Sequence, residues 1–226
     1  MMAADDASLE GLGRYALRFV KRGHTVGLGT GRAASAFIRA LGASGIEVRG
    51  VPTSKASEEL GRSVGIPIVS LTEAGKIDTD FDGADEVDPR LNLNKGYGGA
   101  LVREKIVAAS SRRFVVLVGE EKLVPKLGHR GSLPVEVVPF GVPLAMLEIK
   151  AMGMKPRIRE NDGKEFITDN GNRILDCAVK EIAAPARLDR DLLAIPGVVG
   201  TGLFIGMADL VLVAEASGKI RALKRR

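Results

Sequence analysis

The chain has 226 residues and 45% hydrophobic content, which is enough for one sizeable core or for two smaller ones. Its net charge of +5 fits solubility or the attraction of an anionic substrate, and the basic residues of 219–226 lack the interleaved aromatics typical of a nucleic-acid surface. One cysteine, Cys177, excludes a disulfide within the chain, and no apolar run reaches the roughly 18 residues that span a bilayer. The opening MMAADDASLE has no basic, apolar leader, so we expect a cytoplasmic protein without nucleic-acid or membrane partners.

Strands and helices alternate through the first part of the chain, which predicts a Rossmann-like, doubly wound α/β domain with a parallel sheet. Ser54 is the expected N-cap of one helix, and Gly65 marks the end of that helix. In order, the pattern predicts a helix over 9–20, a strand and glycine turn over 24–31, a helix over 32–41, a strand and loop over 45–54, a helix over 54–65, a strand over 66–71, a strand edge and loop over 76–89, a glycine loop and helix over 95–111, and a buried strand over 113–121.

After about residue 128 the pattern changes to short strands with turn signals, separated by helices over 143–153 and 186–197. This order predicts a smaller α+β domain, similar to a ferredoxin-like or split βαβ unit. The apolar segment 202–215 then predicts a return to the first sheet. We therefore expect an α/β domain over 1–128 and 204–226, and a small α+β domain over 129–203.

The loop GLGTGRAA (27–34) follows a predicted strand and opens a predicted helix. Backbone amides at a helix N-terminus suit the binding of a phosphate, and Thr30 can add a hydroxyl. The pattern matches neither the Walker motif nor G-x-G-x-x-G, so a purely structural glycine turn is the alternative.

The stretch DTDFDGADEVDP (78–89) has six acidic residues. A calcium loop requires a glutamate at its twelfth position, where this chain has Pro89, so we reject that interpretation. Two interpretations remain open, a solvated acidic loop and an active-site segment. In the second, Gly83 and Ala84 let Asp82 and Asp85 converge at a strand end, where ligands bind in open α/β sheets.

The segment KGYGGALVREKIV (95–107) places Lys95 in a glycine loop and Glu104 in the helix that follows. A lysine in such a loop can stabilise a developing oxyanion. The alternative is an ordinary amphipathic helix with Glu104 in water. There is no Ser/His/Asp set and no Cys/His cluster that suggests zinc, so we expect carboxylate acid–base chemistry on an anionic small molecule, with no metal and no cofactor.

These loops, in this order, resemble those of the ribose-5-phosphate isomerase A family. The resemblance covers nearly the whole chain and includes GLGTG, PTSKAS, DGADEVDP, KGYGGALVREKI, LPVEVVPF, TDNGNRILD and PGVVGTGLFIGMADLVLV. It implies a metal-free aldose–ketose isomerase of the non-oxidative pentose phosphate pathway, which interconverts D-ribose 5-phosphate and D-ribulose 5-phosphate through a cis-enediolate. The family commonly forms dimers or tetramers, partly through the small domain, so we expect a homodimer or homotetramer.

The resemblance also implies a role for each motif residue. Glu104 is the base that moves a proton between C1 and C2, Asp82 and Asp85 handle hydroxyl protons and ring opening, and Lys95 stabilises the enediolate. For substrate binding, it implies that Gly83, Ala84, Gly96, Tyr97 and Gly98 line the sugar, while Thr30, Gly31, Arg32, Ala33 and Lys122 hold the phosphate.

Three positions depart from the family pattern. Arg32-Ala33 replace the usual Ser-Thr, and we expect Arg32 to contact the phosphate directly because a guanidinium binds phosphate in a bidentate way. Tyr97 stands where many members have a third glycine, and Leu9-Glu10 stand where some members have a phosphate-binding lysine. The alternative functions are an isomerase or lactonase acting on a related sugar phosphate and a non-catalytic sugar-phosphate sensor. The lactonase is disfavoured because these loops contain no histidine, and the sensor because no DNA-binding helical domain is seen in the sequence.

Overall fold

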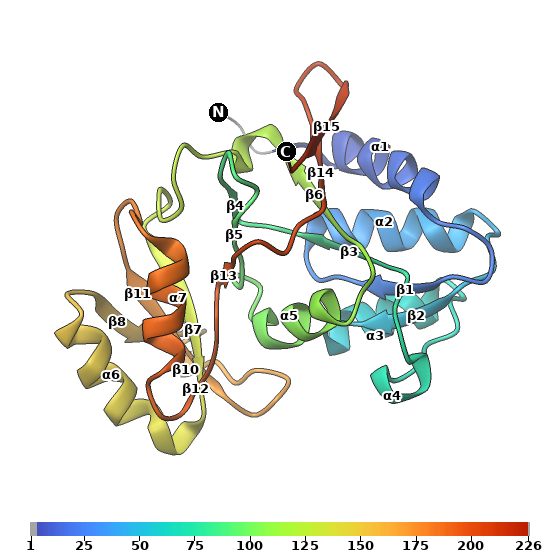
Figure 1. Ribbon diagram of the computed structural model, residues 1–226. Coiled ribbons are helices and arrows are strands. Elements are labelled where there is room, and N and C mark those ends of the chain that lie inside the picture. The colour runs from blue at the N-terminus through green and yellow to red at the C-terminus, as the bar shows by residue number, and fades with distance from the viewer. Residues whose placement is uncertain (1–3, 226) are drawn as a thin grey trace. The chain divides into compact units, whose positions relative to one another are not determined.

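The computed structural model describes residues 4–225 and divides the chain into two compact units. The first three residues of the opening segment and Arg226 of the basic tail lie outside the described range. Unit 1 holds the chain up to Ala84, Arg103–Leu123 and the chain from Met207 onward, and unit 2 holds Asp85–Val102 and Val124–Gly206 (Figure 1). We expected the segment 85–102 in the first domain, whereas its contacts assign it to unit 2.

Unit 1 is built on a six-stranded sheet in the order β15-β14-β6-β3-β1-β2. Five strands are parallel, and only the edge strand β15 is antiparallel. The chain order reverses between β1 and β3, as in doubly wound sheets, which confirms the predicted fold class. The strands are β1 (Thr25–Leu28), β2 (Arg49–Pro52), β3 (Thr79–Gly83), β6 (Phe114–Gly119), β14 (Leu210–Ala214) and β15 (Ile220–Lys224).

The helices of unit 1 bury apolar stripes against this sheet. Leu9 and Leu12 of α1, together with Phe37 and Leu41 of α2, join the strand residues in the main core. Val107 of α5 packs with Val51 and Ile77 in a second, smaller hydrophobic cluster. The helices are α1 (Asp6–Ala16), α2 (Arg32–Ala43), α3 (Lys55–Ser63), α4 (Leu71–Ala74) and α5 (Leu101–Ala109), of which α5 begins in unit 2.

Two local predictions in this unit have different outcomes. Ser54 caps α3 in a reciprocal capping box with Ser57, which confirms the predicted N-cap. The predicted strand over 66–71 is wrong, because Ile68 forms only an isolated bridge with Gly50 and Ser70 caps the short helix α4. Pro67 has no N–H to donate to a ladder, which limits strand pairing there.

Unit 2 contains a four-stranded antiparallel sheet in the order β12-β7-β11-β8. Its elements follow the chain as strand, helix, two strands, helix and strand, which is the ferredoxin-like arrangement predicted from the sequence. They are β7 (Ser132–Val137), α6 (Val142–Ala151), β8 (Lys155–Ile158), β11 (Arg173–Ala178), α7 (Pro185–Leu193) and β12 (Val198–Thr201). Cys177 of β11 is buried in the core of this unit, and burial raises its pKa to about 12, so the thiol serves packing.

Two smaller sheets complete unit 2. The sheet β13-β5-β4 joins β13 (Leu203–Phe204), β5 (Leu93–Asn94) and β4 (Glu86–Val87), and a hairpin pairs β9 (Glu160–Asn161) with β10 (Lys164–Glu165). The sheet β13-β5-β4 was not predicted, because strands of two residues leave no periodic signal, and residues 203–204 pair with β5 rather than joining the first sheet as expected. Among the described helices, none has the length and apolar character needed to cross a membrane.

Candidate active site

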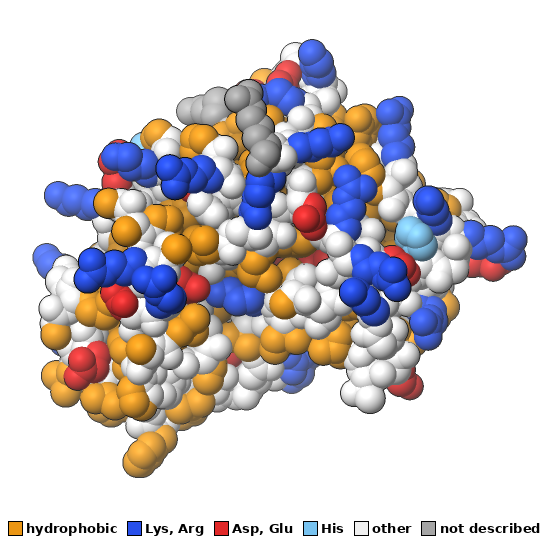
Figure 2. Space-filling view, viewed as in Figure 1, with side chains coloured by type: hydrophobic (Ala, Val, Ile, Leu, Met, Phe, Trp, Pro, Cys, Tyr) orange, Lys and Arg blue, Asp and Glu red, His pale blue; other side chains and the backbone are white. Residues whose placement is uncertain are grey.

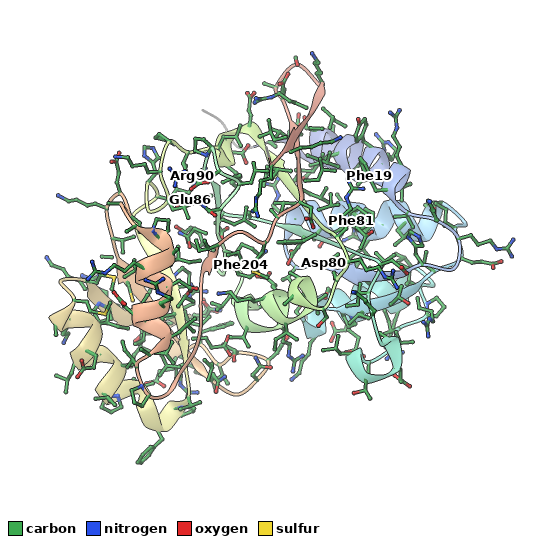
Figure 3. The ribbon with its side chains drawn as sticks, in the orientation of Figure 1. Phe19, Asp80, Phe81, Glu86, Arg90 and Phe204 are labelled. Carbon is green, nitrogen blue, oxygen red and sulfur yellow. The ribbon has the colours of Figure 1, made fainter. Side chains whose placement is uncertain are left out.

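The acidic stretch 78–89 is ordered by hydrogen bonds and is not a solvated loop. Its first half forms β3, an inner strand of the sheet, and Asp80, Asp82 and Glu86 have no exposed surface. Asp80 and Glu86 are labelled in Figure 3. Within their own units, Asp78 accepts from the amide of Thr25, Asp82 from that of Thr30, Asp85 from that of Tyr97, Glu86 from those of Gly128 and Arg130, and Asp88 from those of Arg90 and Asn92.

Asp82 lies at the carboxyl end of β3 and is fixed by backbone amides. Its Oδ1 accepts from Thr30 N at 2.9 Å and from Gly83 N at 2.7 Å. Gly83 ends β3, and Ala84 follows it with partial exposure. Since ligands of open α/β sheets bind at the carboxyl ends of strands near the reversal of strand order, Asp82 and Thr30 occupy the expected location.

The glycines of GLGTG have two different functions. A Cβ at Gly27 would come within 2.3 Å of Asp80 Oδ1, and one at Gly29 within 2.3 Å of Asp82 Oδ1 and 2.5 Å of Asp82 Cα. Gly27 in β1 and Gly29 directly after it therefore make room for the carboxylates of β3. Only Gly31 has a left-handed backbone, with φ +102°, and it directly precedes α2.

The variant Gly29→Ala is expected to lower kcat/KM by about 100-fold, because displacing a positioned group by about 1 Å has costs of this size. Overpacking against the Asp82 backbone is also expected to reduce the free energy of unfolding by about 1–3 kcal/mol. Gly11→Ala is the matched control, since a Cβ there meets nothing within 4 Å in helix α1. Equal activity and melting temperature in the two variants would show that Gly29 is not required for clearance.

The N-terminus of α2 offers donors for an anion. Its first amides, from Arg32 and Ala33 onward, have no acceptor inside the helix, and Gly31 provides no capping side chain. The Arg32 guanidinium is exposed and contacts Asp6 Oδ1 at 2.8 Å and the carbonyl of Ala4 at 3.1 Å. The hydrogen bond to Asp6 raises the pKa of Arg32. Lys122 ends the short 3-10 turn that follows β6, at the same carboxyl edge of the sheet.

A chain of hydroxyls behind this loop was not predicted as part of the site. Thr30 Oγ1 lies 2.8 Å from both Thr53 Oγ1 and Ser54 Oγ, and Ser54 is bonded in turn to Ser57. Thr53 and Ser54 follow β2, whose carboxyl end lies beside that of β1. The sequence marks this segment as the motif PTSKAS, in which Ser54 was predicted as a helix cap and no residue was assigned to the site.

Glu104 lies in the first turn of α5 and is only 4% exposed. This burial excludes the interpretation of Glu104 as a solvated residue of an amphipathic helix. Its apolar neighbours in sequence, Leu101 and Val107, are buried as well. Ionisable side chains are rarely buried to this extent without a structural partner or a chemical role.

Lys95 in unit 2 is also buried, with 2% exposure, and opens the glycine loop. Its amide donates to the carbonyl of Gly202 at 2.8 Å, and its Nζ lies 5.4 Å from the ring centroid of Phe204. Gly96 has φ +106° and Gly99 has φ +83°, and Gly99 N donates to the carbonyl of Gly96. Within residues 4–225, the amides of Gly96 and Gly98 have no protein acceptor; Gly98 is exposed, whereas Gly96 is buried.

Asp85 and Tyr97 are brought together in unit 2. Tyr97 N donates to Asp85 Oδ2 at 3.0 Å, and the phenol donates to the carbonyl of Ser132 at 3.3 Å. Burial of the phenol, followed by the charges of Glu86 and Asp85, raises the pKa of Tyr97, which keeps it protonated. The Tyr97 side chain is therefore bonded to the first residue of β7, Ser132, while its amide orients Asp85.

Taken separately, the two units present the parts of an α/β enzyme for a small anionic substrate: a helix N-terminus at a sheet edge with a buried carboxylate, and a glycine loop with a buried lysine. Comparison with known proteins identifies the family. Residues 49–218 match the profile of ribose 5-phosphate isomerase A, also called phosphoriboisomerase A.

Similar proteins agree over nearly the full length. The chain is 49% identical to a ribose-5-phosphate isomerase A of Roseiflexus sp. over 90% of both chains, and 47% identical to one of Thermomicrobium roseum over 94% of this chain and 91% of the relative. A solved D-ribose-5-phosphate isomerase in complex with phospho-erythronic acid superposes with a TM-score of 0.93 and 38% identity over 100% of both chains. The structure of ribose 5-phosphate isomerase A from Methanocaldococcus jannaschii superposes with a TM-score of 0.92 and 40% identity, covering 98% of this chain and 100% of that one. The chain belongs to the ribose-5-phosphate isomerase A family.

Proposed function

We propose that this protein interconverts D-ribose 5-phosphate and D-ribulose 5-phosphate through a cis-enediolate, in the non-oxidative pentose phosphate pathway of the cytoplasm. The observation that carries the proposal is the burial of Glu104, Lys95 and Asp82, all within the family's motifs. Burial of charged groups is costly, and catalysis is a reason to retain them. The similar solved enzyme binds phospho-erythronic acid, whose phosphate and carboxylate resemble the two ends of a phosphorylated enediolate.

In this proposal Glu104 abstracts the proton next to the carbonyl and returns it to the neighbouring carbon. One base can serve both carbons, because the cis-enediolate presents C1 and C2 on the same face. Lys95 stabilises the negative charge that develops on oxygen, where a positioned cation contributes most. Asp82 and Asp85 exchange protons with the substrate hydroxyls and assist ring opening.

The remaining residues bind and orient the substrate. The amides of Gly31, Arg32 and Ala33, with Thr30 and Lys122, hold the phosphate at the start of α2. Gly83, Ala84, Gly96, Tyr97 and Gly98 line the sugar. Fixing the phosphate restricts the reacting carbons to the vicinity of Glu104, which lowers the entropic part of the barrier.

Arg32 is proposed to leave Asp6 and bind the phosphate. An exposed ion pair such as this one contributes little to stability, so a doubly charged phosphate can replace it. We expect Arg32→Ala to raise KM by about 10-fold with little change in kcat, and Asp6→Ala to leave KM equal or lower it by up to about fivefold. Steady-state kinetics on both variants checks this. An unchanged KM in Arg32→Ala would mean that the guanidinium serves only the contact with α1.

The proposal is tested by following the conversion of ribose 5-phosphate to ribulose 5-phosphate in excess chelator. Turnover that persists supports the metal-free reaction. Turnover that is lost in chelator and restored by one added metal would reject the metal-free part of the proposal. A sugar-phosphate sensor would bind ribose 5-phosphate without converting it, so calorimetry beside the assay separates the two functions.

We also propose that the protein is a homodimer or homotetramer that uses the outer face of α6 together with Phe140, which lies two residues before this helix. Phe140, Leu147 and Leu144 are 99%, 65% and 41% exposed, and hydrophobic side chains gather over α6 in Figure 2. Contiguous exposed apolar residues of this size mark interaction surfaces. Phe140→Ser with Leu147→Ser is expected to lower the mass measured by sedimentation to that of a smaller species, whereas Leu71→Ser, a control on α4, is expected to leave it unchanged.

A further inference from the structure

Arg159 is a semi-buried arginine of unit 2, and the predicted roles leave it unused. It directly follows β8, and its side chain is 11% exposed. Its Nη1 donates to the carbonyl of Gly96 at 2.7 Å and to that of Tyr97 at 3.0 Å. One guanidinium nitrogen therefore fixes two consecutive peptides of the glycine loop.

Asp176 orients this guanidinium from the neighbouring strand β11. Nε and Nη2 of Arg159 donate to the two carboxylate oxygens at 2.8 and 2.5 Å, in a bidentate pair. The Arg159 backbone is held too, since its N–H donates to the carbonyl of Ile174 at 2.8 Å. The Arg159 backbone and two guanidinium nitrogens are thus held in place, while the third nitrogen, Nη1, binds the glycine loop. A lysine has one nitrogen and cannot make both sets of contacts.

Phe166 supports the same loop from another direction. Its amide donates to the carbonyl of Arg159 at 2.8 Å, and its ring centroid lies 6.0 Å from the guanidinium carbon. A Cβ at Gly99 would come within 2.4 Å of the Phe166 ring, so the ring packs directly on the loop backbone. Arg159 therefore contacts Phe166, and Phe166 in turn contacts the loop at Gly99.

The turn after Phe166 is anchored by a buried carboxylate. Glu136 of β7 has no exposed surface, and its Oε1 accepts from Thr168 Oγ1, Asn170 Nδ2 and Asn172 Nδ2 at 3.0, 3.2 and 2.9 Å. Thr168 to Gly171 form a turn in which Gly171 N donates to the carbonyl of Thr168 at 2.8 Å, and Gly171 has φ +82°. A loop that carries Phe166 is thus held at both ends.

We propose that Arg159, oriented by Asp176, is a positioning residue: by holding the carbonyls of Gly96 and Tyr97, it fixes the Tyr97 N–H that binds Asp85 and aims the Gly98 N–H at the sugar end of the substrate. The inference rests on the proposed function, which assigns this glycine loop to the substrate. In a planar trans peptide the N–H points opposite to the C=O, so holding the carbonyls of Gly96 and Tyr97 fixes the directions of the N–H groups of Tyr97 and Gly98. Arg159 itself touches neither substrate nor reacting atoms.

The test compares Arg159→Ala and Arg159→Lys with Arg190→Ala, an exposed arginine on α7. We expect Arg159→Ala to lower kcat by about 100-fold, Arg159→Lys by about 10-fold, and Arg190→Ala to behave as wild type. Calorimetry gives the readout that a purely structural role would not produce: affinity for phospho-erythronic acid falls at least tenfold in Arg159→Ala, while affinity for inorganic phosphate is unchanged. Millimolar guanidinium is expected to restore part of the activity of Arg159→Ala, and urea is expected to restore none.

The inference is overturned if both Arg159 variants keep kcat within threefold of wild type, or if binding of inorganic phosphate falls as much as binding of phospho-erythronic acid. If Arg159→Ala does not fold, the same comparison of kcat and of the two ligand affinities is made with Arg159→Lys. Lys95→Met separates this inference from the proposed function. An inactive Lys95→Met beside fully active Arg159 variants rejects only the inference, whereas an active Lys95→Met rejects the assignment of the glycine loop to the substrate.

Discussion

Glu104→Gln is expected to lower kcat by about 10³- to 10⁴-fold, with KM changed little. Glutamine keeps the size and the hydrogen-bonding oxygen of the side chain but cannot accept the proton from carbon, and loss of a general base has costs at the upper end of this range. Since the side chain is 4% exposed, solvent water has little access to replace it. The measurement is the steady-state rate of ribulose 5-phosphate formation, together with deuterium uptake from solvent into the substrate.

The rate of ribulose 5-phosphate formation and the uptake of deuterium should fall together, because the same base removes and returns the proton. The matched control is Glu59→Gln on α3, an exposed glutamate for which wild-type rates are expected. Calorimetry with phospho-erythronic acid verifies that Glu104→Gln still has a folded site. Activity within tenfold of wild type would assign the proton transfer to another group, with Asp82 the next candidate.

Lys95→Met is expected to lower kcat by about 10²- to 10³-fold, the usual cost of removing one oxyanion donor. Methionine fills a similar volume in the buried position beside Phe204 but carries no charge. KM is expected to change less than kcat, because the lysine interacts most strongly with charge that develops during the reaction.

Thermal unfolding of Lys95→Met separates catalysis from folding, since methionine in a buried position next to an aromatic ring is well tolerated. Lys164→Met on the exposed strand β10 is the control for the loss of one positive charge, and wild-type kinetics are expected for it. A Lys95→Met enzyme with unchanged kcat would contradict the proposed role of Lys95 in stabilising the enediolate.

The motifs of the candidate site could be identified from the sequence because each combines a rare residue pattern with a backbone requirement. Gly31 and Gly96 have the left-handed backbone that favours glycine, so their positions in GLGTG and KGYGG carry information. The role of Gly29 could not be read in this way. Its Cβ position is occupied by Asp82, which is 53 residues away in sequence and is brought beside it by the pairing of β1 with β3.

The contact made by the Arg32 side chain could not be predicted from the sequence. The sequence favoured a phosphate contact, because arginine suits phosphate and stands at the start of a predicted helix. The structure pairs the guanidinium with Asp6 of α1, a helix packed against α2 in the main core. The helix was predicted from periodicity, but the direction of its long, exposed side chain depends on which neighbour supplies a charge.

From the sequence alone came the doubly wound class, the ferredoxin-like character of the second part, the helix cap at Ser54 and the family, because these depend on local periodicity, turn chemistry and ordered motifs. Tertiary structure alone decided that Asp80, Asp82, Lys95 and Glu104 are buried, that the hydroxyls of Thr53 and Ser54 join Thr30, and that Arg159 holds the glycine loop. Burial and hydrogen bonding between distant segments result from strand register and side-chain packing, and neither leaves a periodic trace in the chain.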